Sequence, residues 1–217
     1  MTDVVSILIV LGIIIVSMVL HELAHGYVAY FLGDTTAKEE GRLSLNPLSH
    51  LDPVMSVLLP LILFIVHAPV FGGAKPVPIN PERLKGGVWG MALVAIAGPL
   101  INFLLALIFF VIGMKTGLIG LHNGLIYYSG YEGLAMAEMV MVNLGFMVFN
   151  LLPIPPLDGS RVLYAIMPDG ARELMDRMER GMGIMLVFVM VMVFSTVLST
   201  IMGGAIDGIL RFFDMLV

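Results

Sequence analysis

The chain has 217 residues, of which 59% are hydrophobic and only 12% are charged, and its formal net charge is −5. Soluble domains carry about 25% charged residues, so this composition excludes a soluble globular protein and indicates an integral membrane protein. The sequence has no cysteine and no basic tract, which excludes a disulfide framework, a thiolate metal site and a thiol nucleophile, and argues against a nucleic-acid partner.

The first predicted element is an apolar helix over residues 4–32, and it contains an H-E-x-x-H motif that runs from His21 to His25. Histidines four residues apart share one helix face, so both can offer a ring nitrogen to one metal ion. Glu22 lies about 100° round the helix, where it can act on water without binding the metal. The alternative is a pair of hydrogen-bonded core histidines, but ionisable groups in an apolar span are costly unless they function.

Residues 34–52 are polar, and within them we predict a short β-hairpin over residues 35–45 with its turn at Gly41. Residues 54–68 are apolar but too few to span a bilayer, which takes about 20 residues, so this segment is predicted to dip into the membrane and return. A proline-rich loop over residues 72–85 follows.

The second predicted span covers residues 88–114 and the third covers residues 134–152. Gly98-Pro99 lies within the second span, where proline kinks a helix and frees carbonyls that a neighbour must satisfy. Asn102, one turn later, either satisfies such a group by packing or faces the site.

A proline-rich segment after the third span ends in Asp158-Gly159. The rest of the chain is predicted to form a short helix, a charged surface helix, a fourth span and an amphipathic tail, over residues 160–167, 169–180, 182–202 and 206–217.

We therefore predict one all-α polytopic membrane domain over residues 1–217, with a core over 1–170 and C-terminal helices over 171–217. It has about four to six transmembrane or membrane-dipping helices and a small β-hairpin or sheet after the first helix. With residues 54–68 re-entrant and the N-terminus outside, every Lys and Arg except Lys115 and Arg211 is cytoplasmic, as the positive-inside rule prefers.

This topology predicts a multi-pass protein of the cell membrane with His21 and His25 in its cytoplasmic half. The cytoplasmic end of the third span then places Asp158 at the same depth in the membrane as the two histidines. Two histidines and one carboxylate, with a fourth position open to water, form a known catalytic zinc set.

Three motifs, in this order, resemble those of the site-2 protease family of intramembrane zinc metalloproteases (peptidase M50-like). They are H-E-x-x-H at residues 21–25, Gly98-Pro99-Leu100-Ile101-Asn102, and the run from Phe149 to Gly159 that ends in Asp158-Gly159. Residues 73–78 also resemble this family, and together the resemblance covers roughly residues 1–170. The form that the chain resembles is the short prokaryotic one, without a PDZ-like or CBS-like domain. It implies one zinc ion bound by His21, His25 and Asp158, with Glu22 as general base and with Asn102 and Asn150 holding a substrate strand or the oxyanion.

The predicted function is hydrolysis of peptide bonds in or near transmembrane segments of membrane protein substrates, as in regulated intramembrane proteolysis. The predicted partners are a transmembrane protein substrate and the lipid bilayer, with no nucleic acid and no assigned oligomeric state. The alternative is a membrane protein that binds or transports metal with the same ligands and without hydrolysis. Glu22 discriminates between the two, because a transporter needs no uncoordinated acid beside its ligands.

Overall fold

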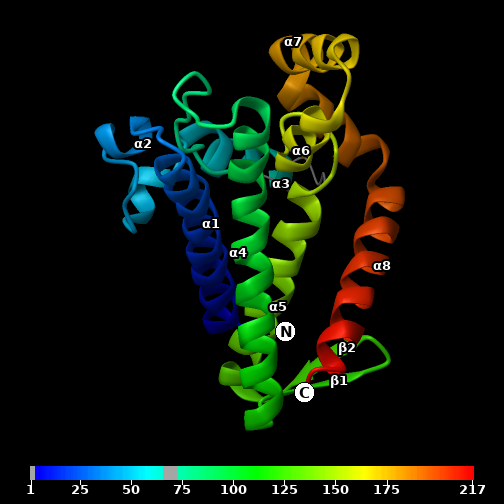
Figure 1. The fold of residues 1–217 in the computed structure, drawn as a ribbon. Helices are drawn as coiled ribbons and strands as arrows, with labels where there is room; N and C mark the ends of the chain where they lie inside the picture. The colour runs from blue at the N-terminus through cyan, green and yellow to red at the C-terminus, as the bar shows by residue number, and fades with distance from the viewer. Residues whose placement is uncertain (1–2, 66–72) are drawn as a thin grey trace.

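The computed structural model describes residues 3–65 and 73–217, which are mostly helical (Figure 1). Three long helices pack against one another: α1 (Val4–Phe31), α4 (Gly87–Thr116) and α5 (Gly130–Asn150). A further long helix, α8 (Ser195–Asp214), contacts α4 and α5. The predicted all-α class with several membrane helices is confirmed.

Among the described residues, four helices are long and apolar enough to cross a membrane: α1, α4, α5 and α8. The shortest has 20 residues, and a helix of that length covers about 30 Å, the thickness of the hydrocarbon core. The first three match the spans predicted over residues 4–32, 88–114 and 134–152. The protein is therefore a multi-pass membrane protein.

A fourth span is present, but the bounds predicted for it, residues 182–202, are wrong. Helix α7 (Asp169–Val193) continues through the predicted surface helix, the chain turns at Phe194, and α8 includes most of the predicted tail. Neither glycine nor proline marks this break. Packing explains α8, because Leu210 and Phe213 are almost fully buried in the core cluster that α8 forms with α4 and α5.

The β-hairpin predicted over residues 35–45 is also misplaced. Residues Thr36–Glu39 form the short helix α2 instead. The side chain of Asp34 explains the difference, because its Oδ1 atom accepts hydrogen bonds from both the backbone amide and the hydroxyl of Thr36. Such local bonds favour the start of a helical turn over a strand.

A two-stranded antiparallel sheet does follow the first helix, but it lies between α4 and α5. Strand β1 (Ile119–His122) pairs with β2 (Leu125–Tyr128). The two residues between the strands, Asn123 and Gly124, have φ values of 52° and 77°, as tight hairpin turns require.

Whether residues 54–68 dip into the membrane and return stays a prediction, but the described residues before and after the end of this segment contact one another. Its described part contains the 3₁₀ helix η1 (Pro47–His50), the π-helix η2 (Pro53–Leu58) and α3 (Leu59–Ile65), and residues 66–68 of the prediction lie outside the described residues. The Lys75 amide donates to the His50 carbonyl at 2.8 Å, and the Ser56 hydroxyl donates to the Gly73 carbonyl at 2.6 Å. The two flanks of the segment therefore lie side by side.

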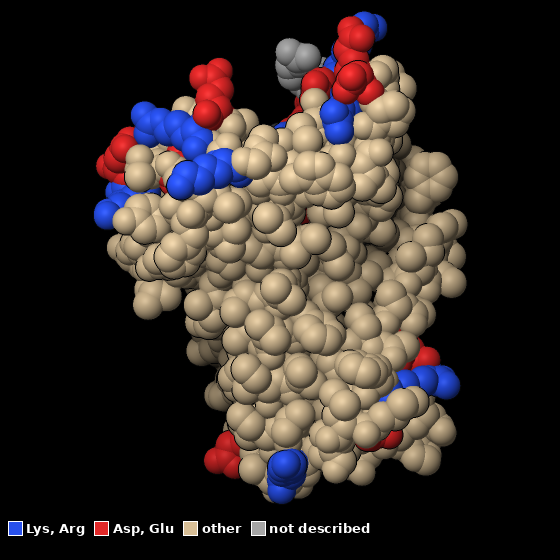
Figure 2. Space-filling view, in the orientation of Figure 1, with Lys and Arg blue, Asp and Glu red and all other residues tan. Residues whose placement is uncertain are grey.

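Charged side chains gather at the two ends of the molecule, and the face between them is almost free of charge (Figure 2). Every Lys and Arg except Lys115 and Arg211 belongs to a segment at the end that carries α2, α7 and α6 (Asp158–Ile166). Lys115 and Arg211 lie in the last turns of α4 and α8, at the opposite end.

Candidate metal centre

His21 and His25 lie one helical turn apart on α1, are both buried, and face α4. Their Nε2 atoms are 3.0 Å apart. Asp158, the first residue of α6, places its Oδ2 atom 3.2 Å from the Nε2 atom of His21 and 3.4 Å from that of His25. The structure thus brings the three residues predicted as zinc ligands to one point.

A chain of buried amide side chains fixes the proton on His21. The Met139 carbonyl only accepts, so the atom of Asn143 that faces it at 2.8 Å is Nδ2. Asn143 Oδ1 then accepts from Asn102 Nδ2 at 2.7 Å, which places Asn102 Oδ1 2.5 Å from His21 Nδ1. Because an amide oxygen only accepts, His21 carries its proton on Nδ1 and keeps the Nε2 lone pair for a metal.

The same amide chain connects three helices. Asn143 on α5 also donates to the hydroxyl of Ser17, which lies one turn before His21 on α1. The side chains of Ser17, Asn102 and Asn143 are fully buried, and a buried polar group without a partner costs about 1–3 kcal/mol. The chain of hydrogen bonds therefore stabilises one register of α1, α4 and α5 around the histidines.

His25 is oriented by a backbone group. Its Nδ1 atom donates to the carbonyl of Val94 on α4 at 2.7 Å, so its Nε2 atom also has a free lone pair. The Oδ2 atom of Asp158 is buried without a hydrogen-bond partner. Two lone pairs and a carboxylate oxygen at this separation repel one another unless a cation lies between them.

The donor set fits one zinc ion. Tetrahedral zinc binds nitrogen and oxygen at about 2.0–2.2 Å, which separates neighbouring donor atoms by roughly 3.3–3.6 Å. The three donor atoms of His21, His25 and Asp158 lie 3.0–3.4 Å apart. Three protein ligands also leave a fourth position, as catalytic zinc sites do.

Gly98 allows α4 to approach the two histidines. A Cβ atom at this position would lie 2.4 Å from the Nε2 atom of His25 and 2.6 Å from that of His21. Pro99 lies inside α4, as predicted. The Gly-Pro pair, whose predicted effect on the helix was a kink, therefore also provides room for the candidate metal ligands.

A tight turn after α5 positions Asp158. Three prolines in residues 151–157 lack an amide hydrogen, so the helix ends at Asn150. Gly159 packs against this turn, and a Cβ atom there would lie 2.2 Å from the carbonyl oxygen of Leu151. Helix α6 begins at Asp158 and packs against α4, which places the carboxylate beside α1.

Glu22 lies next to the ligand cluster without belonging to it. Its Oε2 atom accepts a hydrogen bond from the backbone amide of Val77 at 2.9 Å. The carboxylate therefore lies between α1 and residues 73–80, which form neither helix nor strand. This position suits a general base better than a fourth ligand.

The two asparagines predicted to hold substrate differ in their surroundings. Asn102 contacts His21 and Asn143, as described above. Asn150 donates to the Phe146 carbonyl within α5 at 3.0 Å and is half-buried. The role of either residue toward a substrate stays a prediction.

Sequence reasoning missed Ser17, Asn143, Val94 and the close approach at Gly98. Ser17 and Asn143 could have been flagged as polar residues within apolar spans, because such residues need partners in lipid. The roles of Val94 and Gly98 depend on how α1 packs against α4, which no local pattern reveals.

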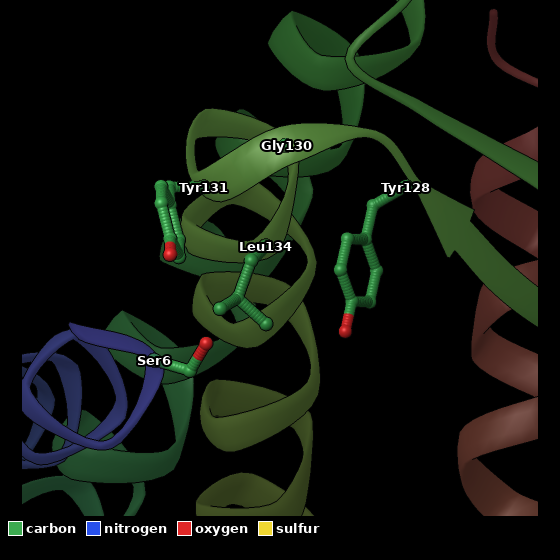
Figure 3. A pocket seen from close by; sticks show the side chains of 5 residues that line it. All are labelled: Ser6, Tyr128, Gly130, Tyr131 and Leu134. Atoms are coloured by element: carbon green, nitrogen blue, oxygen red, sulfur yellow. The ribbon is translucent and has the colours of Figure 1, made fainter. Parts of the chain in front are cut away.

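A separate pocket lies where α1 and α5 begin (Figure 3), lined by Ser6, Tyr128, Gly130, Tyr131 and Leu134. The hydroxyl of Tyr131 donates to Asp3 at 2.6 Å. Tyrosines with an apolar ring and a polar tip are typical of the membrane–water interface. None of the five lining residues is a metal ligand, so this pocket is distinct from the metal centre.

Apolar helices long enough to span a membrane, arranged around two histidines and one carboxylate that could hold a metal ion, fit one class of protein: the integral membrane proteins with a zinc site of the catalytic type. Comparison with known families matches residues 114–194 to Peptidase family M50. The motifs, the fold and the similarities reported next agree: the chain belongs to peptidase family M50, the site-2 protease family.

The chain is similar to a protein of Bacillus subtilis (strain 168) named "Putative zinc metalloprotease YwhC", with 38% identity over 202 residues, 93% of this chain and 89% of the relative. It is 30% identical over 152 residues to "Putative zinc metalloprotease Rip2" of Mycolicibacterium smegmatis, which covers 69% of this chain and 53% of the relative. It is 28% identical over 155 residues to "Zinc metalloprotease MJ0392" of Methanocaldococcus jannaschii, which covers 71% of this chain and 33% of the relative. No solved structure gives a significant match.

Proposed function

We propose that this protein is an intramembrane zinc metalloprotease that hydrolyses peptide bonds in or near transmembrane segments of other membrane proteins. One observation carries the proposal: Glu22 lies beside the cluster of His21, His25 and Asp158 and is bonded to a backbone amide. A metal-binding or transport protein has no use for an uncoordinated acid at that position.

Zinc held by His21, His25 and Asp158 would supply Lewis acidity, which polarises a peptide carbonyl and makes water nucleophilic near neutral pH. Glu22 takes a proton from the attacking water, whose oxygen bonds to the carbonyl carbon. Glu22 then gives this proton to the nitrogen of the leaving amine as the C–N bond breaks, and so regains its charge.

The surroundings of the site support a substrate within the bilayer. Helices α1 and α4, which carry the histidines and Gly98, are exposed along much of their apolar length. A transmembrane helix hides its carbonyls in its own hydrogen bonds, so a substrate must be extended where it meets the site.

The distribution of Lys and Arg supports a cytoplasmic location for the end that carries α2, α6 and α7. His21 and His25 lie in the C-terminal half of α1, toward this end. We therefore place the active site in the cytoplasmic half of the membrane and the N-terminus outside.

The function is tested by comparing membrane protein fragments from cells that carry the wild type or Glu22→Gln. The proposal predicts that fragments cut at transmembrane segments disappear in the variant while their intact precursors accumulate. Identical fragments in both strains would contradict it. A metal transporter would instead change cellular zinc without changing the fragments.

A further inference from the structure

Arg42 is a buried cation that the proposed mechanism does not use. It lies in the loop after α2 and is only 8% exposed. None of the ion pairs in the described part of the chain includes it. Its Nη2 atom instead donates to two backbone carbonyls, those of Lys75 at 2.9 Å and Pro76 at 3.3 Å. Burying a guanidinium is costly, so this use of its donors calls for an explanation.

The two carbonyls belong to the segment that touches Glu22. The next residue, Val77, donates its backbone amide to Glu22 Oε2 at 2.9 Å. Pro76 and Pro78 on either side have no amide hydrogen and a fixed φ. The Val77 amide is therefore the only backbone donor between residues 76 and 78, and the position of the Lys75 and Pro76 carbonyls sets its direction.

Gly26 lets this segment lie directly on α1. A Cβ atom at Gly26 would lie 2.5 Å from Leu43 Cδ2 and 3.1 Å from Val77 Cγ1. Gly26 is one turn beyond Glu22, and Leu43 follows Arg42 in the chain. The loop that carries Arg42 and the segment that carries Val77 therefore meet at one point on the helix that bears Glu22.

We propose that Arg42 is a positioning residue for Glu22. Arg42 fixes the carbonyls of Lys75 and Pro76, and this directs the Val77 amide at Glu22 Oε2. The bond holds the carboxylate in one orientation and leaves Oε1 to exchange the proton with water. The inference rests on the proposed function, because it requires Glu22 to be the general base.

The test measures cleavage of a fluorescently labelled membrane protein substrate with one transmembrane segment by the full-length, zinc-loaded protein in detergent micelles. Arg42→Met is expected to lower kcat by about 10- to 100-fold, because small displacements of a catalytic group have effects of that size. KM and the zinc content should stay at the wild-type values. Arg42→Lys should recover part of kcat, because an ammonium group can still donate to one carbonyl.

Arg83→Met is the matched control. Arg83 lies at the same end of the molecule, but its partners are Glu39 and Thr35, away from Glu22. Its loss should leave kcat unchanged. Val77→Pro is a second test, because it removes the amide donor while Arg42 stays in place, and it should lower kcat as Arg42→Met does.

A folded, zinc-loaded Arg42→Met protein with the kcat of the wild type would overturn the inference, and so would a rise in KM alone. If Arg42→Met does not fold, wild-type kcat in Val77→Pro overturns it. Failure of the proposed function looks different: the wild type then cleaves nothing, or Glu22→Gln cleaves as well as the wild type.

Discussion

The Nδ1 atom of His21 lies 2.5 Å from the Oδ1 atom of Asn102 on the neighbouring helix. A ligand whose second nitrogen donates to a fixed acceptor is held in one tautomer and one ring orientation. Asn102 is itself held by Asn143, so the contact joins the metal centre to the packing of three helices. The side chain of Asn102 is fully buried, so bulk water does not compete for this contact.

Asn102→Leu should therefore weaken zinc binding by about 10- to 100-fold, the usual effect of losing a partner of a metal-bound histidine. Competition with a chromogenic chelator measures the zinc affinity of the purified protein. Asn150→Leu is the control, because the hydrogen bond of Asn150 lies within α5, and it should keep wild-type affinity. Equal affinity in Asn102→Leu and the wild type would rule out this role.

Gly98→Ala should abolish zinc binding without unfolding the protein. The new methyl group would lie less than 3 Å from the Nε2 atoms of both His21 and His25, whereas alanine in place of glycine favours a helix by about 1 kcal/mol. Gly145→Ala on α5 meets no atom within 4 Å and should bind zinc normally. Zinc content reports on the site, and circular dichroism reports on the fold of the two variants. A Gly98→Ala protein that binds one zinc ion per chain would show that α4 does not approach the histidines this closely.

Sequence spacing was enough to bring His21 and His25 together, because residues four apart share a helix face. The predicted direction of each span placed Asp158 at the same depth as the two histidines, although the exact end of each helix was unknown. The partners of His21 and His25 on α4 and α5 could not be predicted, because they depend on the distance and rotation between helices. The misplaced hairpin has a local cause, since the bonds of Asp34 to Thr36 compete with strand formation.

The fourth span shows a different limit. Hydropathy favoured residues 182–202, but the chain turns at Phe194 without a helix breaker. The burial of Leu210 and Phe213 against the bundle decides where the last helix lies. The hydropathy of a short segment carries no information on such tertiary contacts.

Asp34 connects the end of α1 to the loop before α4. Its carboxylate accepts from Thr36 on one side and from the Asn80 amide, at 2.6 Å, on the other. Burial raises the pKa of Asp34, but the hydrogen bonds from Thr36 and Asn80 and the nearby Arg83 outweigh burial and hold the pKa below its usual value. A depressed folded-state pKa means that the ionised group stabilises the fold above its unfolded-state pKa, and that this contribution is lost as the pH falls through the folded-state pKa.

Asp34→Asn should lower the free energy of unfolding by about 1–3 kcal/mol at neutral pH, because one backbone donor then faces an amide nitrogen. The difference in the free energy of unfolding between the wild type and the variant should disappear as the pH falls below about 4. Thermal unfolding in micelles across this range measures it, with exposed Glu40→Gln as the control. A gap that does not change with pH would show that the charge of Asp34 contributes nothing.

The proposed orientation is testable with single cysteines, because the chain has none of its own. A reagent that does not cross membranes, added outside intact cells, should label a cysteine at Lys115. It should not label cysteines at Glu40, Glu82 or Arg177 until the membrane is permeabilised. If the cysteines at positions 40 and 82 were labelled from opposite sides of the membrane, residues 54–68 would have to cross it.

The most direct test of the whole account is the activity of purified Glu22→Gln in the presence of zinc. Glutamine keeps the size of Glu22 but does not take up the proton, and Glu22 is not one of the clustered ligands. The account predicts one zinc ion per chain in both the wild type and the variant, with cleavage of a transmembrane substrate by the wild type alone. Cleavage by the zinc-loaded variant at the wild-type rate would contradict it.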